Sequence, residues 1–134
     1  MRAEIKRQHA LTIAGAGARI AYGSDWPVDP LNEWFALKVG VTRMNSPIAG
    51  ADYVPRLGED KGLTLQQVLR SITMNSSYEL HQDAATGSLK VGKMADVIVL
   101  DRNVLAIPAD QIADTRVAQT VVGGRIVYSI DGRE

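Results

Sequence analysis

Residues 18–25, Ala-Arg-Ile-Ala-Tyr-Gly-Ser-Asp, determine the fold class that the sequence predicts. Apolar side chains alternate with charged or small ones from residue 18 to residue 23, which is the period-two pattern of a short β-strand. Asp25 follows directly, at the carboxyl end, where α/β proteins place their binding and catalytic side chains. We therefore expect an α/β fold with Asp25 standing at the end of a strand.

A helix is expected on each side of this strand. Upstream, apolar and small residues within 3–17 recur at helical spacing, and the helix should end near Gly15 or Gly17, because glycine readily adopts the left-handed conformation that terminates helices. Downstream, Asp29 can cap a helix that has Pro30 at its first position. The buried face of that second helix would carry three large apolar side chains: Leu31, Trp34 and Phe35.

Two stretches should lack regular structure. Residues 26–30 contain two prolines, which remove backbone donors and prevent regular pairing after the strand. Residues 45–62 contain five glycines or prolines and have no clear period, as is typical of long surface segments that border binding sites.

The middle of the chain carries a strong helix signal. Thr64 and Gln67 have the spacing of a capping box, in which each side chain bonds a backbone amide of the other residue. Apolar residues follow at helical spacing: Leu65, Val68, Leu69 and Ile72. The sequence predicts a helix that begins after Thr64.

From Thr86 onward the pattern changes to β-structure. Residues 97–100, Val-Ile-Val-Leu, form a continuous apolar run of the kind that is buried on both faces of a sheet. Residues 117–122 and 125–128 flank Gly123-Gly124, which suits the positive φ angles of a tight hairpin turn. The sequence therefore predicts helices around one strand, followed by an all-β tail.

Composition excludes several classes of protein. The chain has 134 residues, which is enough for one core but short of the roughly 250 residues of a complete (β/α)₈ barrel. It has no cysteine, so disulfide scaffolds and zinc–thiolate sites are excluded. Its 15 basic and 15 acidic side chains balance, which argues against nucleic acid or an acidic membrane as a partner. With no signal-peptide pattern at the start, we expect a cytoplasmic protein.

Asp25 is the candidate site residue, and its residue type leaves two readings open. A carboxylate at a strand end can bind a metal or accept a proton, or it can simply bond the amides of its own turn. His9 and His81 could complete a three-ligand metal site with Asp25, but they lack the close spacing of a ligand pair. Ser24 could act as a nucleophile with one of these histidines, but no nucleophile-elbow sequence surrounds it.

Residues 23–28, Gly-Ser-Asp-Trp-Pro-Val, are the first of four stretches that carry the motifs of one known family. They resemble the last barrel strand, and the turn after it, of the amidohydrolase 3 family of metal-dependent amidohydrolases. Residues 64–78, which include Thr73-Met74-Asn75, resemble the helix that follows. Residues 87–101 and 114–128 resemble the return into a small β-sandwich and its closing hairpin. The resemblance covers nearly the whole chain, with the motifs in the family's order.

The resemblance implies a C-terminal piece of an amidohydrolase TIM barrel, the last strand and its flanking helices over 1–85, followed by strands of the small β-sandwich domain over 86–134. It also implies hydrolysis of carbon–nitrogen bonds by water activated on divalent metal, zinc being the usual ion. Asp25 would then be the metal ligand and proton-transfer residue, and Trp26 would contact the small-molecule substrate. Lys93 and Asp96 belong to a motif that is structural in the family.

The other metal ligands of the family lie upstream in its members and have no counterpart in this sequence. We therefore expect the chain to be inactive alone, and a non-catalytic, self-associating module derived from the family is the alternative. A strand at 18–23 would also have two unpaired edges, and the faces that normally meet the barrel would be wet. The expected partner is a second copy or a complementary barrel fragment, unless the chain refolds around its β tail.

Overall fold

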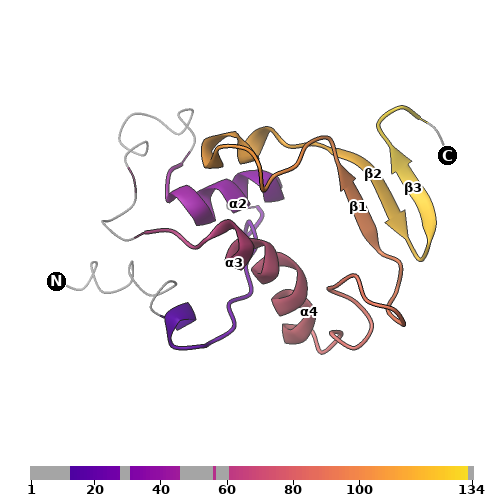
Figure 1. Cartoon of the computed structure of the whole chain (residues 1–134), viewed down its shortest axis with the longest axis horizontal. Helices are drawn as coiled ribbons and strands as arrows, with labels where there is room; N and C mark the ends of the chain where they lie inside the picture. Colours follow the sequence, from indigo (N-terminus) through magenta and orange to yellow (C-terminus); the bar gives the residue numbers. More distant parts are fainter. Residues whose placement is uncertain (1–12, 28–30, 46–55, 57–60, 133–134) are drawn as a thin grey trace.

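The computed structural model of the chain describes residues 13–27, 31–45, 56 and 61–132, and it places helices beside a small antiparallel sheet (Figure 1). The predicted combination of helices and strands is confirmed. No helix in these described ranges is long and apolar enough to cross a membrane. The elements follow in chain order: α2 (Glu33–Thr42), α3 (Leu65–Arg70), the π-helix η3 (Ser71–Asn75), α4 (Ser76–Glu79), β1 (Val97–Leu100), the 3₁₀-helix η4 (Ala109–Asp114), β2 (Val117–Val122) and β3 (Arg125–Ser129).

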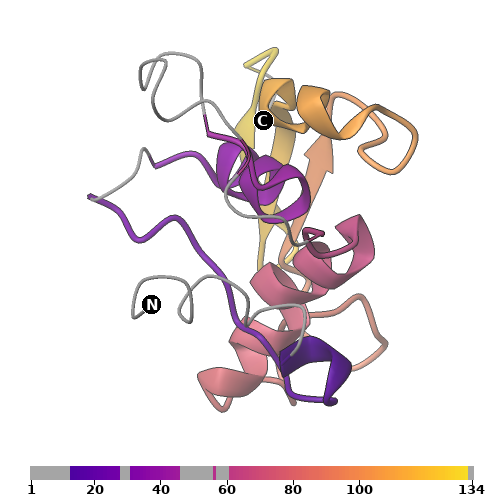
Figure 2. The ribbon, with the colours of Figure 1, turned by 90° about the vertical axis from the view of Figure 1, so that its left-hand side faces the viewer.

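The core lies where α2, α3 and η4 meet. Its buried apolar side chains come from these three elements and from the segment before α3: Leu37, Leu63, Val68 and Ile112. Both views place η4 directly beside α2 (Figures 1 and 2), although the two helices are far apart in the sequence. Residues from both predicted parts, 1–85 and 86–134, therefore share one core. The division of the chain at residue 86 stays a prediction.

Helix α2 begins later than the sequence predicted. Its N-cap is Asn32, whose amide oxygen accepts hydrogen bonds from the backbone N–H groups of Trp34 and Phe35, both at 3.1 Å. Such a cap satisfies two donors that have no partner inside the helix. The predicted start at Pro30 was wrong, because Leu31 lies before the helix and is 73% exposed instead of packing on its buried face. Asp29 and Pro30 themselves lie outside the described residues.

The predicted helix after Thr64 is confirmed, with its capping box. The backbone N–H of Gln67 donates to Thr64 Oγ1 at 3.2 Å, and the N–H of Thr64 donates to Gln67 Oε1 at 2.8 Å. The helix continues from α3 through the π-helical turn η3 into α4 (Figure 1). Inside η3 the backbone takes an extra residue per turn, and such insertions are frequent at functional sites.

The sheet has the order β1-β2-β3, and both strand pairs are antiparallel. The hairpin predicted around Gly123-Gly124 is confirmed, since both glycines have positive φ, 56° and 80°. The predicted burial of residues 97–100 on both faces was wrong. The middle residues of β1, Ile98 and Val99, point to opposite faces of the sheet and are 48% and 47% exposed, so neither face is buried at these positions.

The predicted strand at residues 18–23 is not part of any sheet. The chain is extended there, but it forms no strand ladder with another described residue, and a strand is defined by such pairing. Before it, Ile13–Gly15 is helical and Gly17 has a φ of 84°, which confirms the expected end of the first helix. The rest of that helix lies outside the described residues, as does most of the segment 45–62.

Lys93 and Asp96 hold turns in the structure. Lys93 Nζ donates to the carbonyl oxygens of Asp83 and Thr86, at 2.5 Å and 2.8 Å, and so closes the loop after α4. Asp96 Oδ1 accepts from the backbone N–H of Gly123 at 2.7 Å, which joins the start of β1 to the hairpin turn. These contacts agree with the structural role that the family resemblance implies for the two residues.

Gly87 packs closely against Ser77 of α4, whereas Gly92 has open space around it, and substitutions can test this difference. Both have positive φ, 82° and 90°, but a Cβ at residue 87 would lie 2.5 Å from Ser77 Cβ, whereas one at residue 92 would meet nothing within 4 Å. We expect Gly92→Ala to cost about 1 kcal/mol of unfolding free energy and Gly87→Ala about 1–3 kcal/mol more. Urea unfolding measures both, and equal losses would contradict the close packing at Gly87.

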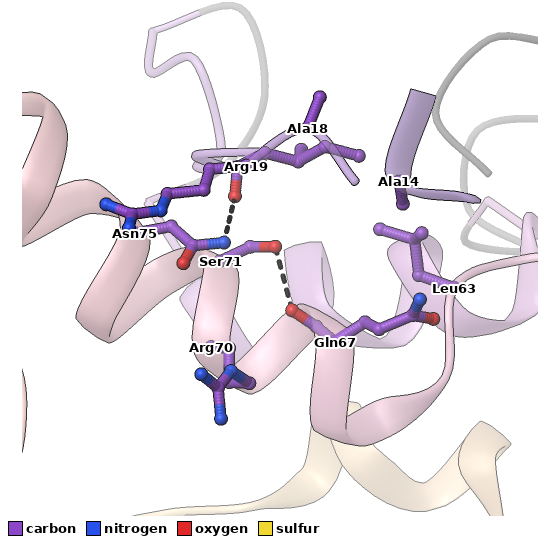
Figure 3. Close-up of a pocket in the computed structure, with 9 residues that line it drawn as sticks. Ala14, Ala18, Arg19, Leu63, Gln67, Arg70, Ser71 and Asn75 are labelled. Carbon is purple, nitrogen blue, oxygen red and sulfur yellow. Dashed lines mark hydrogen bonds between the residues drawn. The ribbon is translucent and has the colours of Figure 1, made fainter. Parts of the chain in front are cut away.

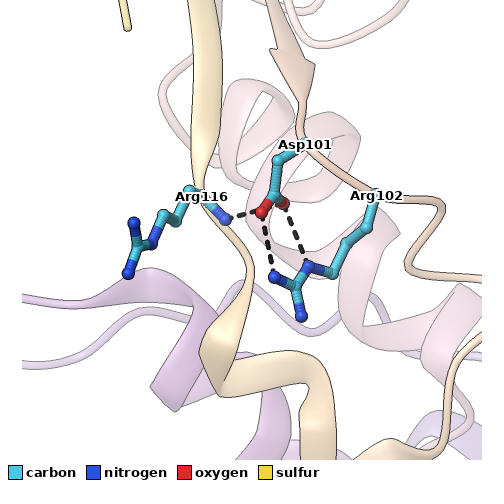
Figure 4. Close-up of polar contacts among 3 residues, drawn as sticks. All are labelled: Asp101, Arg102 and Arg116. Atoms are coloured by element: carbon cyan, nitrogen blue, oxygen red, sulfur yellow. Dashed lines mark hydrogen bonds and ion pairs between the residues drawn. The ribbon is translucent and has the colours of Figure 1, made fainter.

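Asp101 extends the pairing of β1 with β2 beyond the last strand residue (Figure 4). Its backbone N–H donates to the Arg116 carbonyl at 3.0 Å, and its Oδ1 accepts from the Arg116 N–H at 3.0 Å. The Arg102 guanidinium donates to both carboxylate oxygens, at 3.1 Å and 2.9 Å. The Arg102 bonds, followed by the Arg116 N–H, hold the pKa of Asp101 below its ordinary value of 3.8.

Since folding lowers the pKa of Asp101, its ionised form stabilises the fold above the ordinary pKa, and this contribution is lost as the pH falls through the lowered value. Asp101→Asn should therefore reduce the melting temperature at pH 7, and the difference from the wild type should shrink below pH 4. The exposed Asp131→Asn is the control and should change little. A deficit in the Asp101 variant that is independent of pH would contradict this linkage.

Candidate functional site

The extended segment of residues 18–24 leads to Asp25, and side chains rather than strand neighbours hold it. Asn75 Nδ2 donates to the Ile20 carbonyl at 2.9 Å, and Tyr22 Oη donates to the Ala36 carbonyl in α2 at 3.0 Å. Ser24 Oγ donates to Glu33 Oε1, also in α2, at 3.2 Å. The segment is thus tied to α2 on one side and to η3 on the other.

Asn75 comes from the π-helical turn and points toward the extended segment (Figure 3). Close to this contact, the Arg19 guanidinium lies 3.7 Å from the centre of the Tyr78 ring, a cation–π contact that holds the beginning of the segment. A hollow of about 250 Å³ lies between the segment and the helix, lined by residues that include Arg19, Ser71 and Asn75. Asp25 does not line this hollow, so we place the candidate site at the other end of the segment.

Asp25 stands at that end, in an exposed turn that directly follows the buried residue Ser24. Its φ is 56°, a left-handed conformation that aspartate tolerates better than most residues. Its carboxylate is exposed and accepts no hydrogen bond from any described residue. Trp26 follows it and is 63% exposed. The structure thus brings an unpartnered carboxylate and an exposed aromatic ring together in one turn.

The described residues give no support to a metal site or a Ser24 nucleophile that uses a histidine. His81 lies in the turn after α4 with a φ of 56° and is exposed, while His9 lies outside the described residues. No group of three His, Asp, Glu or Cys residues that could hold a metal ion occurs in the described part of the chain. Ser24 is bonded to Glu33 instead of to a histidine, so the nucleophile arrangement considered from the sequence is not formed there.

Sequence reasoning missed the two residues that fix the approach to Asp25, Glu33 and Asn75. Glu33 reads as an ordinary acidic residue of a first helical turn, and its contact with Ser24 spans nine residues. Asn75 carried a weak signal, because asparagine is unfavourable inside a helix unless its side chain has a partner elsewhere. That partner, the Ile20 carbonyl, is 55 residues away in the sequence.

Comparison with known proteins matches residues 8–128 to a model described as "Amidohydrolase family". An N-substituted formamide deformylase from Arthrobacter pascens is 28% identical over 87% of this chain and 20% of its own length. A putative amidohydrolase from Bacillus subtilis is 26% identical over 87% of this chain and 22% of its own length. An imidazolonepropionase from Streptococcus gordonii is 30% identical over 60% of this chain and 26% of its own length.

No solved structure matches the chain. The chain spans about a fifth of the length of the first two curated relatives. The residues that match the family model include the extended segment, Asp25, the α3–α4 helix and the three-stranded sheet up to Tyr128. Because the family match covers most of the sequence, the chain belongs to the amidohydrolase family.

Proposed function

We propose that this chain supplies the C-terminal part of a metal-dependent hydrolase of carbon–nitrogen bonds, with Asp25 as a metal ligand and proton-transfer residue. The observation that carries the proposal is the free Asp25 carboxylate at the end of a segment held by three side-chain hydrogen bonds. Family membership and the deformylase and amidohydrolase names of two relatives support this reaction class.

Asp25 has the chemistry that one ligand of a divalent cation requires. Carboxylate oxygens bind zinc and harder divalent ions, and this carboxylate is exposed and unpartnered in the described residues. These residues do not form a complete ligand set, so the remaining ligands have to come from outside them. A bound divalent cation would supply an activated water, and Asp25 would accept the proton of that water and pass it to the leaving nitrogen.

Trp26 extends this proposal to the substrate. An exposed indole ring next to the reacting carboxylate can cover the apolar part of a small amide-type molecule. Its ring also excludes water from that side of the site, which strengthens the electrostatic interactions there.

The rest of the site would come from a complementary barrel fragment or from a second copy of the chain. We infer this from residues 18–24, which are extended but pair with no other strand in the described ranges, as the last strand of an incomplete barrel would. A second candidate, a non-catalytic association module, is favoured by the apolar side chains that the sheet exposes: Ile98, Val99, Val122, Ile126, Val127 and Tyr128.

A chimera distinguishes these two functions. Residues 8–128, which match the family model, would replace the corresponding stretch of the Arthrobacter pascens deformylase, so that the remaining chain of that enzyme supplies the other part of the site. We expect the chimera to hold metal and to hydrolyse an N-substituted formamide. Asp25→Asn should lower the rate by about 10²–10⁴-fold, because the amide can no longer accept the proton.

The control is Asp110→Asn, another exposed acidic residue within the grafted stretch, which should leave the rate unchanged. Metal analysis and circular dichroism would accompany each rate measurement, so that loss of folding is recognised. A folded, metal-loaded chimera that is inactive, or one whose rate survives Asp25→Asn, would contradict the enzymatic proposal and favour the association module.

A further inference from the structure

Ser24 is the last buried residue before Asp25. It is 8% exposed, whereas Asp25 and Trp26 are both exposed. A buried hydroxyl needs a hydrogen-bond partner, since an unsatisfied polar group costs free energy. That partner is Glu33 Oε1, at 3.2 Å. The exposed turn that carries Asp25 therefore begins immediately after a buried residue that is anchored to α2.

Beyond Ser24, no described side chain fixes Asp25. Its carboxylate has no hydrogen-bond partner in the described ranges, and its backbone is in the left-handed region within a turn. The direction of the carboxylate therefore depends on where the preceding residue is held. Tyr22 is bonded to the Ala36 carbonyl two residues earlier, but the Ser24–Glu33 bond is the contact adjacent to Asp25.

The partner of Ser24 is itself well placed to act as a fixed anchor. Glu33 is the first residue of α2, and the Asn32 cap fixes the start of that helix through bonds to Trp34 and Phe35. One turn later, Ala36 and Leu37 of the same helix are buried in or beside the core. A carboxylate at a helix N-terminus is also favoured by the helix dipole. Glu33 thus has two separable properties, a negative charge and a hydrogen-bond acceptor.

We propose that Glu33 is a positioning residue for Asp25, acting through the buried hydroxyl of Ser24. The role of Asp25 that this positioning serves rests on the proposed function, whereas the effect of Glu33 on the Asp25 turn does not. The physical claim is that the first turn of α2 sets the orientation of the Asp25 turn through one side-chain hydrogen bond. The charge of Glu33 stabilises the helix, and its acceptor oxygen positions Asp25.

The test separates these two properties by comparing Glu33→Gln, which keeps an acceptor oxygen, with Glu33→Ala, which does not. Backbone ¹⁵N relaxation of the chain would give the order parameter of the Asp25 amide. We expect it to fall from about 0.85 to below about 0.6 in Ser24→Ala and Glu33→Ala, and to stay near the wild-type value in Glu33→Gln. The double variant Ser24→Ala/Glu33→Ala should match the single variants, because both remove the same bond.

The free energy of unfolding reports the contribution of Glu33 to stability separately from its effect on Asp25. Urea unfolding should show a loss in both Glu33→Gln and Glu33→Ala, because both remove the charge that interacts with the helix dipole. The loss should be larger in Glu33→Ala, which also leaves the buried Ser24 hydroxyl without its partner. Glu79→Gln, an exposed acidic residue in α4, is the matched control and should leave the Asp25 amide unchanged. An order parameter that is equally low in Glu33→Gln and Glu33→Ala, or unchanged in both, would overturn the proposal.

The same variants in the chimera connect positioning to catalysis. Glu33→Ala should lower kcat about tenfold with KM unchanged, and Glu33→Gln should restore it. The relaxation measurement does not depend on hydrolysis, so a folded, metal-loaded chimera that is inactive would contradict the proposed function and leave the positioning result standing. A Glu33→Ala chimera with unchanged kcat would contradict the link from Glu33 to the chemistry.

Discussion

The hydrogen bond from the Asn75 side chain to the Ile20 carbonyl connects the two parts of the molecule on which the candidate site depends. An extended segment normally satisfies its backbone groups by pairing with neighbouring strands, and this segment pairs with none in the described ranges. Asn75 supplies one of the missing donors from a helix 55 residues away. The Tyr22 and Ser24 hydroxyls then tie the segment to α2, so that two helices replace the strand neighbours.

Two local signals predicted local structure correctly. The capping box at Thr64 and the turn at Gly123-Gly124 involve residues at most three positions apart, so their geometry follows from the residue types themselves. The strand predicted at residues 18–23 does not form among the described residues, and the strand at 97–100 forms but is not buried on both faces. Pairing and burial depend on neighbouring strands and covering layers, which no pattern within the segment specifies.

The residues of the candidate site also fall into two groups, those that a local motif identifies and those that it does not. Asp25 and Trp26 could be identified because they stand in a short motif directly after an apolar segment. Glu33 and Asn75 could not, because each acts through a contact with a distant residue, and their residue types are common in helices or at helix starts. A motif therefore identifies the group that can do chemistry. The residues that orient this group are recognisable only once the packing of α2 and η3 is known.

The segment before Asp25 is held by helices of the same chain and not by neighbouring strands. If Asp25 were oriented by strand neighbours alone, a chain without those neighbours would have no defined carboxylate position. Here the contacts that approach Asp25 come from α2 and η3, which lie within the chain itself and pack on its own core of Leu37 and Val68. The chain thus anchors the residue before Asp25 by itself; in the proposed function, a complementary segment would bring the remaining ligands without also having to order this turn.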